Sequence, residues 1–433
     1  MPTSGERSEG SWRDLPVPPD PLPRSASRTG APRLRVLEAL RHRDFRLLFT
    51  GQTISQVGDA AFIVALGWRA FTLTHKASSL GIVLMVEALG LVTTLLIGGV
   101  LADRYSRKVL LISSDTARAV VIGALALVDA TGHLRFGILV AFVALHGLGS
   151  GLFQPAFGGI LPLLVEEPSL GSANALVGVS RQAAFVIGPA LAGTIYGLAG
   201  SSAIFAADAA SFAASAAFLA FARPRVYEPP PAEGLRRELS AGFRYVITVP
   251  WLWITISTFS VVLMVGYAAF QVLLPKLVEQ EWHGGVGAYG LLFTLQGVGM
   301  VAGSVVLAQL SPRRRRGALI YALFVCNTVL GALLGLSPWY AGAAVLQVGR
   351  GFCVGFGITL WDTMVMQRVP PHMLARVISM DWFGSIGLLP AGLAIWAALS
   401  GLAAPGTLIA ASSAFCTCLF LLGLLDPRIR STD

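Results

Sequence analysis

Charged side chains recur inside the long apolar segments of this sequence. The acids are Asp59, Glu87, Asp115, Asp208, Asp362 and Asp381, and the bases are Arg69, Arg118, Arg181 and Arg350. A charge at the centre of a membrane helix costs about 2.5 to 3.5 kcal/mol and usually faces the interior of a helix bundle. Each of these residues therefore needs either a partner or a function.

Three of the acids are candidates for binding protons. Asp59 lies deepest, roughly 20 Å from the end of its segment at a rise of about 1.5 Å per residue. Glu87 lies about 12 Å deep by the same arithmetic, and Asp208 lies no deeper. A carboxyl group in such a place can exchange a proton at working pH. We predict that Asp59, Glu87 and Asp208 share a cavity and that one of them carries a coupling proton.

The other charges are expected to form pairs within the membrane. Asp115 and Arg118 are three residues apart on one helix and can form an ion pair on one face, so structural and functional roles stay open for both. Arg181 can pair with Asp59, with Asp115 or with neither, and Arg350 belongs to the same group of intramembrane charges.

Three charges lie nearer to the segment ends. For Asp362 and Asp381 we expect structural roles with Arg368 or Arg376 as partners, because water is within about two helical turns. Arg69 is expected to extend its side chain to the membrane surface.

Groups for covalent chemistry are missing from the sequence. It contains no HExxH helix, no phosphate-binding loop ending in GK[ST] and no nucleophile elbow. We therefore expect no catalytic residues, no metal and no cofactor, and a protein that is not an enzyme. An ion gradient, with protons as the leading ion, remains as the source of energy.

The composition indicates that these charges lie on membrane-spanning helices. The chain has 433 residues, of which 55% are hydrophobic and 13% charged, with a mean hydropathy of +0.70. Segments of about 20 apolar residues can cross a bilayer as helices. We predict an all-α integral membrane protein with twelve spans, at residues 45–72, 79–102, 108–130, 134–161, 172–199, 202–222, 251–275, 287–310, 317–336, 339–362, 377–399 and 404–425.

Loop charge predicts the orientation. Most of the 32 lysines and arginines fall in the two termini and in every second loop, whereas only Lys76, Arg135 and Lys276 fall in the alternate loops. Basic loops stay in the cytoplasm, so we expect a multi-pass protein of the cell membrane with both termini cytoplasmic. The net charge of +9 then reflects topology and not nucleic-acid binding.

The predicted organisation is two six-helix bundles. We place a disordered cytoplasmic tail at 1–32, the first bundle at 33–222, a linker at 223–250, the second bundle at 251–426 and a short tail at 427–433. The linker begins with prolines and continues with apolar residues at helical spacing, Leu235, Leu239, Phe243 and Val246. This pattern favours a helix in the membrane interface, although a simple charged linker stays open.

The segment GVLADRYSRK, residues 99–108, resembles the signature loop of the major facilitator superfamily, with Ser106 where that family usually has Gly. The resemblance implies a cytoplasmic gating loop that works in alternating access. Its residues here are Gly99, Asp103, Arg104, Arg107 and Lys108. A loop that only sets topology would carry the same cations, but it would not need the acid or the glycine.

Other motifs resemble the drug and siderophore exporter branch of that superfamily, which includes macrolide and enterobactin efflux proteins. They are IGPALAG at 187–193, HRDFRLLFTGQTISQVGD at 42–59 and ANAL at 173–176. The first is similar to the antiporter motif and implies a bend at Gly188, Pro189 and Gly193. Many proton-driven members carry an arginine in span four, where this chain has LHGLGSG with His146.

The resemblance and the buried acids together favour one function. We expect a proton-coupled secondary transporter that exports small hydrophobic or amphipathic molecules and works as a monomer in the bilayer. Uptake or facilitated transport of a metabolite stays open, and so does a membrane sensor or scaffold without transport. The sequence does not identify the substrate.

Overall fold

The computed structural model describes residues 35–225, 235–310, 312, 314–430 and 432, and for some residues inside helices it describes the backbone only. The tail predicted at 1–32 lies outside this part of the chain. The described residues form helices and short connections, without a strand. This agrees with the predicted all-α membrane fold.

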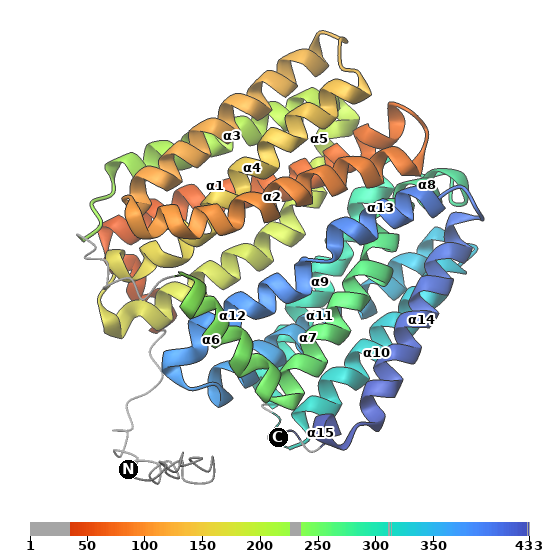
Figure 1. Cartoon of the computed structure of the whole chain (residues 1–433). Helices are drawn as coiled ribbons and strands as arrows, with labels where there is room; N and C mark the ends of the chain where they lie inside the picture. Colours follow the sequence, from red (N-terminus) through yellow and green to blue (C-terminus); the bar gives the residue numbers. More distant parts are fainter. Residues whose placement is uncertain (1–34, 226–234, 311, 313, 431, 433) are drawn as a thin grey trace, which may run out of the picture. The chain divides into compact units, whose positions relative to one another are not determined.

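The first half of the chain forms five long helices (Figure 1). Their bounds are α1 Arg43–Thr72, α2 Ala77–Arg104, α3 Arg107–Ala130, α4 Phe136–Leu164 and α5 Leu170–Phe221, with short turns η1 Arg35–Arg41 and η2 Glu167–Ser169. At about 1.5 Å per residue, the 52 residues of α5 are far too long for one crossing. Gly200, at φ 79°, interrupts the helical backbone of α5 and divides it into two membrane-length parts.

The second half begins with an amphipathic helix and continues with broken and unbroken spans. The bounds are α6 Leu235–Thr248, α7 Pro250–Val262, a π-helical turn η3 Leu263–Tyr267, α8 Ala268–Gln280, α9 Val286–Leu310, α10 Arg316–Gly335, α11 Tyr340–Arg368, α12 Pro371–Ile386, α13 Leu389–Leu399, α14 Pro405–Leu425 and α15 Pro427–Arg430. Figure 1 shows α6 lying across α12, with which it packs. Burial of the Tyr245 ring on α6 raises the pKa of its phenol.

Ten helices of the described residues are long and apolar enough to cross a membrane. Among these ten, α7, η3 and α8 together count as one span. Helix α5 also counts as one, although Gly200 divides it into two parts. Helix α1 has 30 residues but is outside this set. The total of twelve therefore stays a prediction, but the described helices begin and end within a few residues of the predicted spans.

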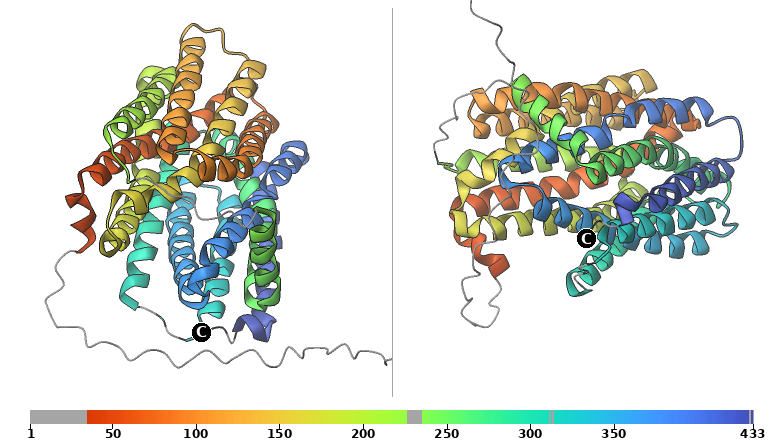
Figure 2. Two further views of the ribbon diagram at one scale, coloured as in Figure 1. Left: turned by 60° about the vertical axis from the view of Figure 1, so that its left-hand side comes forward. Right: turned by 60° about the horizontal axis from the view of Figure 1, so that its bottom comes forward.

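The long helices run roughly side by side, as the two views of Figure 2 show. Successive helices reverse direction, so their junctions alternate between two ends. The basic end has the junctions that follow α2, α4, α9 and α11, together with α15. The opposite end has the junctions that follow α1, α3, α8, α10 and α13, together with Gly200.

Apolar packing differs between these ends. At the opposite end one cluster of buried side chains includes members of both halves, among them Phe62, Phe205, Leu273 and Trp396. At the basic end the first half has its own cluster around Phe157, and the second half has separate clusters. The shared core therefore holds the two halves together at the opposite end.

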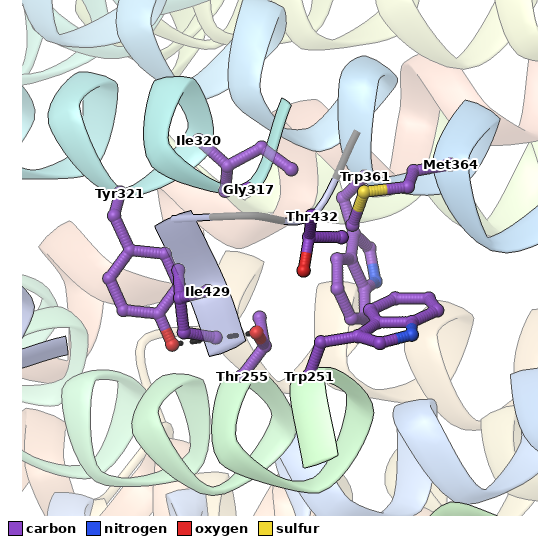
Figure 3. A pocket seen from close by; sticks show the side chains of 9 residues that line it. All are labelled: Trp251, Thr255, Gly317, Ile320, Tyr321, Trp361, Met364, Ile429 and Thr432. Carbon is purple, nitrogen blue, oxygen red and sulfur yellow. Dashed lines mark hydrogen bonds between the residues drawn. The ribbon is translucent and has the colours of Figure 1, made fainter. Parts of the chain in front are cut away.

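The last residues of the chain fold back onto the second half. Figure 3 shows Ile429 and Thr432 beside Trp251, Trp361 and Tyr321 in a small pocket. Ile429 is 1% exposed, and the carbonyl oxygen of Thr432 accepts a hydrogen bond of 3.0 Å from the amide of Gly317 on α10. Within the segment predicted as a short tail, Ile429 and Thr432 thus pack on the second half.

Candidate functional site

Several of the predicted intramembrane charges of the first half lie near Arg118 on α3. Its guanidinium forms a close ion pair with Asp115 one turn earlier. The other oxygen of Asp115 accepts a hydrogen bond of 2.7 Å from Ser215 on α5, and Gln52 on α1 donates to Ser215 at 2.7 Å. Asp115 is fully buried and Arg118 is 4% exposed, so this pair is a fixed part of the bundle interior.

Asp59 approaches the same arginine from α1, but more loosely. Its carboxylate lies 4.0 Å from Nη1 of Arg118, and about a third of its side chain is exposed. A separation of 4.0 Å is too long for a hydrogen bond. Arg118 is therefore held mainly by Asp115, and Asp59 can change its charge while that pair stays intact.

Two further predicted acids, Glu87 and Asp208, lie close enough to Asp59 for their charges to act on it. Glu87 on α2 lies 3.2 Å from Nδ1 of His146 on α4, and its charge also acts on Asp59. Asp208 on α5 is fully buried, and its Oδ2 has no hydrogen-bond partner among the described residues. Its charge acts on Asp59 as well. We call these six residues the acid cluster: Asp59, Glu87, Asp115, Arg118, His146 and Asp208.

Aromatic rings and glycines make room for the acid cluster. The guanidinium of Arg118 lies over the rings of Phe153 and Phe212, with its Cζ 4.6 Å and 4.2 Å from their centroids. Gly149 on α4 lets this side chain pass, since an added Cβ would lie 2.9 Å from Cγ of Arg118. Cation–π contacts of this kind stabilise a desolvated guanidinium by about 2 kcal/mol.

The predicted gating loop is described only in part. Gly99, Asp103 and Arg104 lie in the last turns of α2, and their side chains are outside the described part of the structure. Arg107 donates to the carbonyl oxygen of Gly159 on α4. Lys108 donates to the carbonyl oxygens of Ala220 and Ala222 at 2.8 Å and 2.7 Å. These bonds tie the start of α3 to the ends of α4 and α5.

The glycines and proline of the antiporter-like motif lie at helix crossings. Gly188 packs against the backbone of Ala60 on α1. Pro189 and Gly193 meet α9, where the Pro189 carbonyl oxygen is close to Gly290. These residues and their neighbours border a groove of about 330 Å³ between α5 and α9. The backbone of α5 remains helical at Pro189.

Several expected partners of the other charges are different in the structure. Arg69 forms an ion pair of 2.7 Å with Asp129, which the sequence did not predict, and the other oxygen of Asp129 accepts a hydrogen bond from Ser201. Arg181 and Asp362 are exposed side chains within spans of different halves, and their charges act on one another.

Asp381 has neutral partners in place of the expected arginines. Its carboxylate accepts hydrogen bonds of 2.9 Å from the indole of Trp361 and 3.4 Å from Ser385. For Arg350 the structure gives no carboxylate among the described residues within 4.0 Å, and its hydrogen bond is to Gln347 at 3.0 Å. Arg350 thus differs from Arg69 and Arg118, each of which forms an ion pair with an aspartate.

The two halves meet across polar as well as apolar contacts at the opposite end. His75 after α1 lies 3.6 Å from Glu279 on α8. The ring of Trp68 on α1 packs on that of Tyr289 on α9, with centroids 5.8 Å apart. Gly81 on α2 lies against α13 closely enough that an added Cβ would be 2.7 Å from Cβ of Ala397. Close helix approach through small residues thus packs the two halves together at this end.

Sequence reasoning missed three parts of this site. It noted His146 only as a departure from a motif and did not pair it with Glu87, 59 residues earlier. It also left out Gln52 and Ser215, whose side-chain amide and hydroxyl group, respectively, donate hydrogen bonds to Asp115. Polar residues at helical spacing within apolar segments would have been the available signal.

Two bundles of membrane-length helices with ionisable groups in the interior are the architecture of a major facilitator transporter. Comparison with solved structures shows the same fold. The nucleoside transporter NupG matches with a TM-score of 0.68 and 12% identity, over 88% of this chain and 99% of that one. A bacterial homologue of the human lysosomal transporter Spinster, in an inward-facing and unoccupied conformation, matches with a TM-score of 0.66 and 13% identity over 90% and 98%.

The chain belongs to the family of transmembrane secretion effectors, whose model matches residues 35–432. The enterobactin exporter EntS of Citrobacter koseri is 28% identical to it over 398 residues, which are 89% of this chain and 91% of that protein. EntS of Escherichia coli is also 28% identical over the same shares. The protein is accordingly a transport protein of the membrane and not an enzyme.

Proposed function

We propose that this protein exports small hydrophobic or amphipathic molecules by alternating access, driven by protons that bind to the acid cluster. The single observation that carries this proposal is the arrangement around Arg118, in which one carboxylate is tightly paired and a second is loosely held and part-exposed. The similarity to exporters over most of the chain supports the direction of transport.

A proton can act through Asp59 because of its place in the cluster. When Asp59 is ionised, its charge and that of Asp115 share Arg118. When Asp59 is protonated, that attraction is lost, and Asp208 and Glu87 no longer repel a neighbouring charge. The gross Coulomb energy at 4.0 Å is about 4 kcal/mol at an effective dielectric constant of about 20, and solvent screening of the part-exposed carboxylate lowers it to about 1 kcal/mol. A difference of this size changes the ratio of two conformations about fivefold.

His146 is a further polar member of the acid cluster. Its Nδ1 contacts Glu87, and its Nε2 is buried without a partner among the described residues. This histidine lies in span four, where many proton-driven members of the superfamily carry an arginine, so the place of that arginine is taken by a side chain that contacts Glu87.

The packing of the two halves supports alternating access. They share a core at the opposite end, whereas at the basic end each half has its own clusters. By the distribution of basic residues we propose that the basic end is cytoplasmic, so that this arrangement faces inward. A substrate would then enter from the cytoplasm or the inner leaflet and leave when the contacts of the opposite end separate.

The test is an accumulation screen in a host that lacks its own efflux pumps. Cells with the wild-type protein, the Asp59→Asn variant or an empty vector are loaded with members of an antibiotic and siderophore panel, and the retained amount is measured with and without a protonophore. Wild type should lower retention of at least one compound, and the protonophore should abolish this effect. Higher retention with wild type would show uptake, and an effect that survives the protonophore would exclude proton coupling.

A further inference from the structure

Arg350 on α11 is an intramembrane cation with few partners. A guanidinium has five N–H donors, and its hydrogen bond to the described residues is from Nη1 to Gln347. Its Nε is buried without a partner. The side chain is nevertheless part-exposed, so Nη2, which has no protein partner in the described chain either, is not sealed off.

The first half of the same chain shows how a buried arginine is usually neutralised. Arg118 and Arg350 both lie over phenylalanine rings, at 4.2 Å from Phe212 and 4.3 Å from Phe270 respectively. Arg118 has Asp115 and Asp59 as counter-ions, whereas no carboxylate of the described residues lies within 4.0 Å of Arg350. An intramembrane cation without a counter-ion is unfavourable, and such residues are candidates for a functional role.

The guanidinium of Arg350 is held in one orientation. Gln347, which is fully buried, accepts from Nη1 through Oε1 and donates at 3.1 Å from Nε2 to Gln296 on α9. On another side Gly331 of α10 leaves room for it, since an added Cβ would lie 3.4 Å from Nε. A positioned guanidinium with free donors is prepared to bind a carboxylate or phenolate through two hydrogen bonds.

Irregular backbone lies next to this residue. The π-helical turn η3 ends at Tyr267, three residues before Phe270, and the first turn of α13 packs on it where Gly392 meets Met264. Such breaks within a membrane are tolerated where they border protein interior or a water-filled cavity, and π turns are frequent at functional sites. Tyr267 is 43% exposed, as expected for a side chain at a cavity wall.

We propose that Arg350 is a binding site for an anionic group of the substrate, so that this transporter selects amphipathic anions such as aromatic carboxylates and phenolates. The apolar part of the ligand would lie along the π turn, where Tyr267 is exposed, and its acidic group would bind to Nη2 of Arg350. This inference rests on the proposed transport function, whose substrate class it specifies. The acid cluster and the anion site would thus occupy different halves.

The experiment measures binding without transport, in purified full-length protein in detergent. Melting temperatures are recorded against increasing 2-naphthoate and against the neutral 2-naphthamide of nearly equal size, and each series gives an apparent Kd. Wild type should bind the naphthoate about tenfold more tightly than the amide. Arg350→Gln should remove this preference, and Arg350→Lys should keep it at about threefold to tenfold lower affinity, because an ammonium lacks the bidentate geometry.

Arg135→Gln is the matched control, since it removes an exposed arginine at the start of α4, remote from the site in sequence and structure; its preference should equal that of wild type. No preference in wild type, or an unchanged preference in Arg350→Gln, would overturn the proposal. If the glutamine variant does not fold, unchanged affinity in Arg350→Lys would overturn it equally.

The choice of buffer shows whether the site binds an organic anion or an inorganic one. In a low-salt zwitterionic buffer without chloride the naphthoate preference should be present, and added chloride should reduce it only by competition. If chloride alone stabilises wild type and the naphthoate adds nothing, the site holds an inorganic ion and the substrate class is wrong. Because none of these measurements uses export, a negative accumulation screen would contradict the proposed function without deciding this one.

Discussion

Replacing Asp59 with asparagine separates proton coupling from structural pairing. Its carboxylate is 4.0 Å from Nη1 of Arg118, which corresponds to about 4 kcal/mol of gross Coulomb energy at an effective dielectric constant of about 20. Because about a third of the side chain is exposed, solvent screening reduces the net contribution to about 1 kcal/mol. Asp59→Asn should therefore fold, with a free energy of unfolding lowered by no more than about 1 kcal/mol.

Asp115→Asn is the matched control, because it removes the other carboxylate of the same arginine. Asp115 is fully buried, forms the close ion pair with Arg118 and accepts a hydrogen bond from Ser215. Breaking a buried pair from one side costs about 3 to 5 kcal/mol. This variant should give little folded protein or a clearly lower melting temperature.

The assay combines melting curves of the purified variants with export at two pH values, for a compound found by the accumulation screen. Asp59→Asn should bind the compound and melt near wild type, while export against a gradient fails and any downhill exchange becomes independent of pH. The reasoning is refuted if Asp59→Asn is as unstable as Asp115→Asn, or if it retains uphill export.

Three further changes test other parts of the structure. Asp103→Ala should impair export while the protein still inserts, which export assays normalised to membrane abundance would show; normal export would remove the gating role of this loop. Gly188→Val should lower the yield of folded protein in size-exclusion profiles, because an added Cβ would lie 2.9 Å from the backbone carbon of Ala60, whereas Gly197→Ala, with open space around it, should match wild type. Ile429→Ala should lower the stability by about 2 to 5 kcal/mol, because the side chain is buried in the pocket of Figure 3; an unchanged melting temperature would argue against that packing.

Most of the fold could be predicted because its signals are local. Apolar length and loop charge located most of the helix ends within a few residues. The sequence predicted two spans with a gap at residues 200 and 201, and the structure interrupts α5 at Gly200. The π turn η3 was not predicted, since it occurs within the uniformly apolar stretch 251–275. Hydropathy does not distinguish a π turn from an α-helix.

The site could be predicted in its members but not in its pairs. Asp115 and Arg118 pair as their spacing predicts, because both are on one helix. The partner of Asp59 is Arg118 and not Arg181, and this depends on how α1 and α3 face each other. Asp129 was overlooked as the partner of Arg69 for the same reason, since the two are 60 residues apart.

The most direct test of proton-driven alternating access is a pair of distances measured by spin labels in lipid nanodiscs, in a background without the native cysteines. One pair of cysteines, at Tyr105 and Leu310, spans the two halves at the basic end, and another, at His133 and Trp339, spans them at the opposite end; all four side chains are exposed. As the pH changes between 8 and 5, alternating access gated by the acid cluster predicts that one distance shortens while the other lengthens, and that Asp59→Asn abolishes this response. Two distances that stay fixed, or a response that Asp59→Asn leaves unchanged, would contradict it.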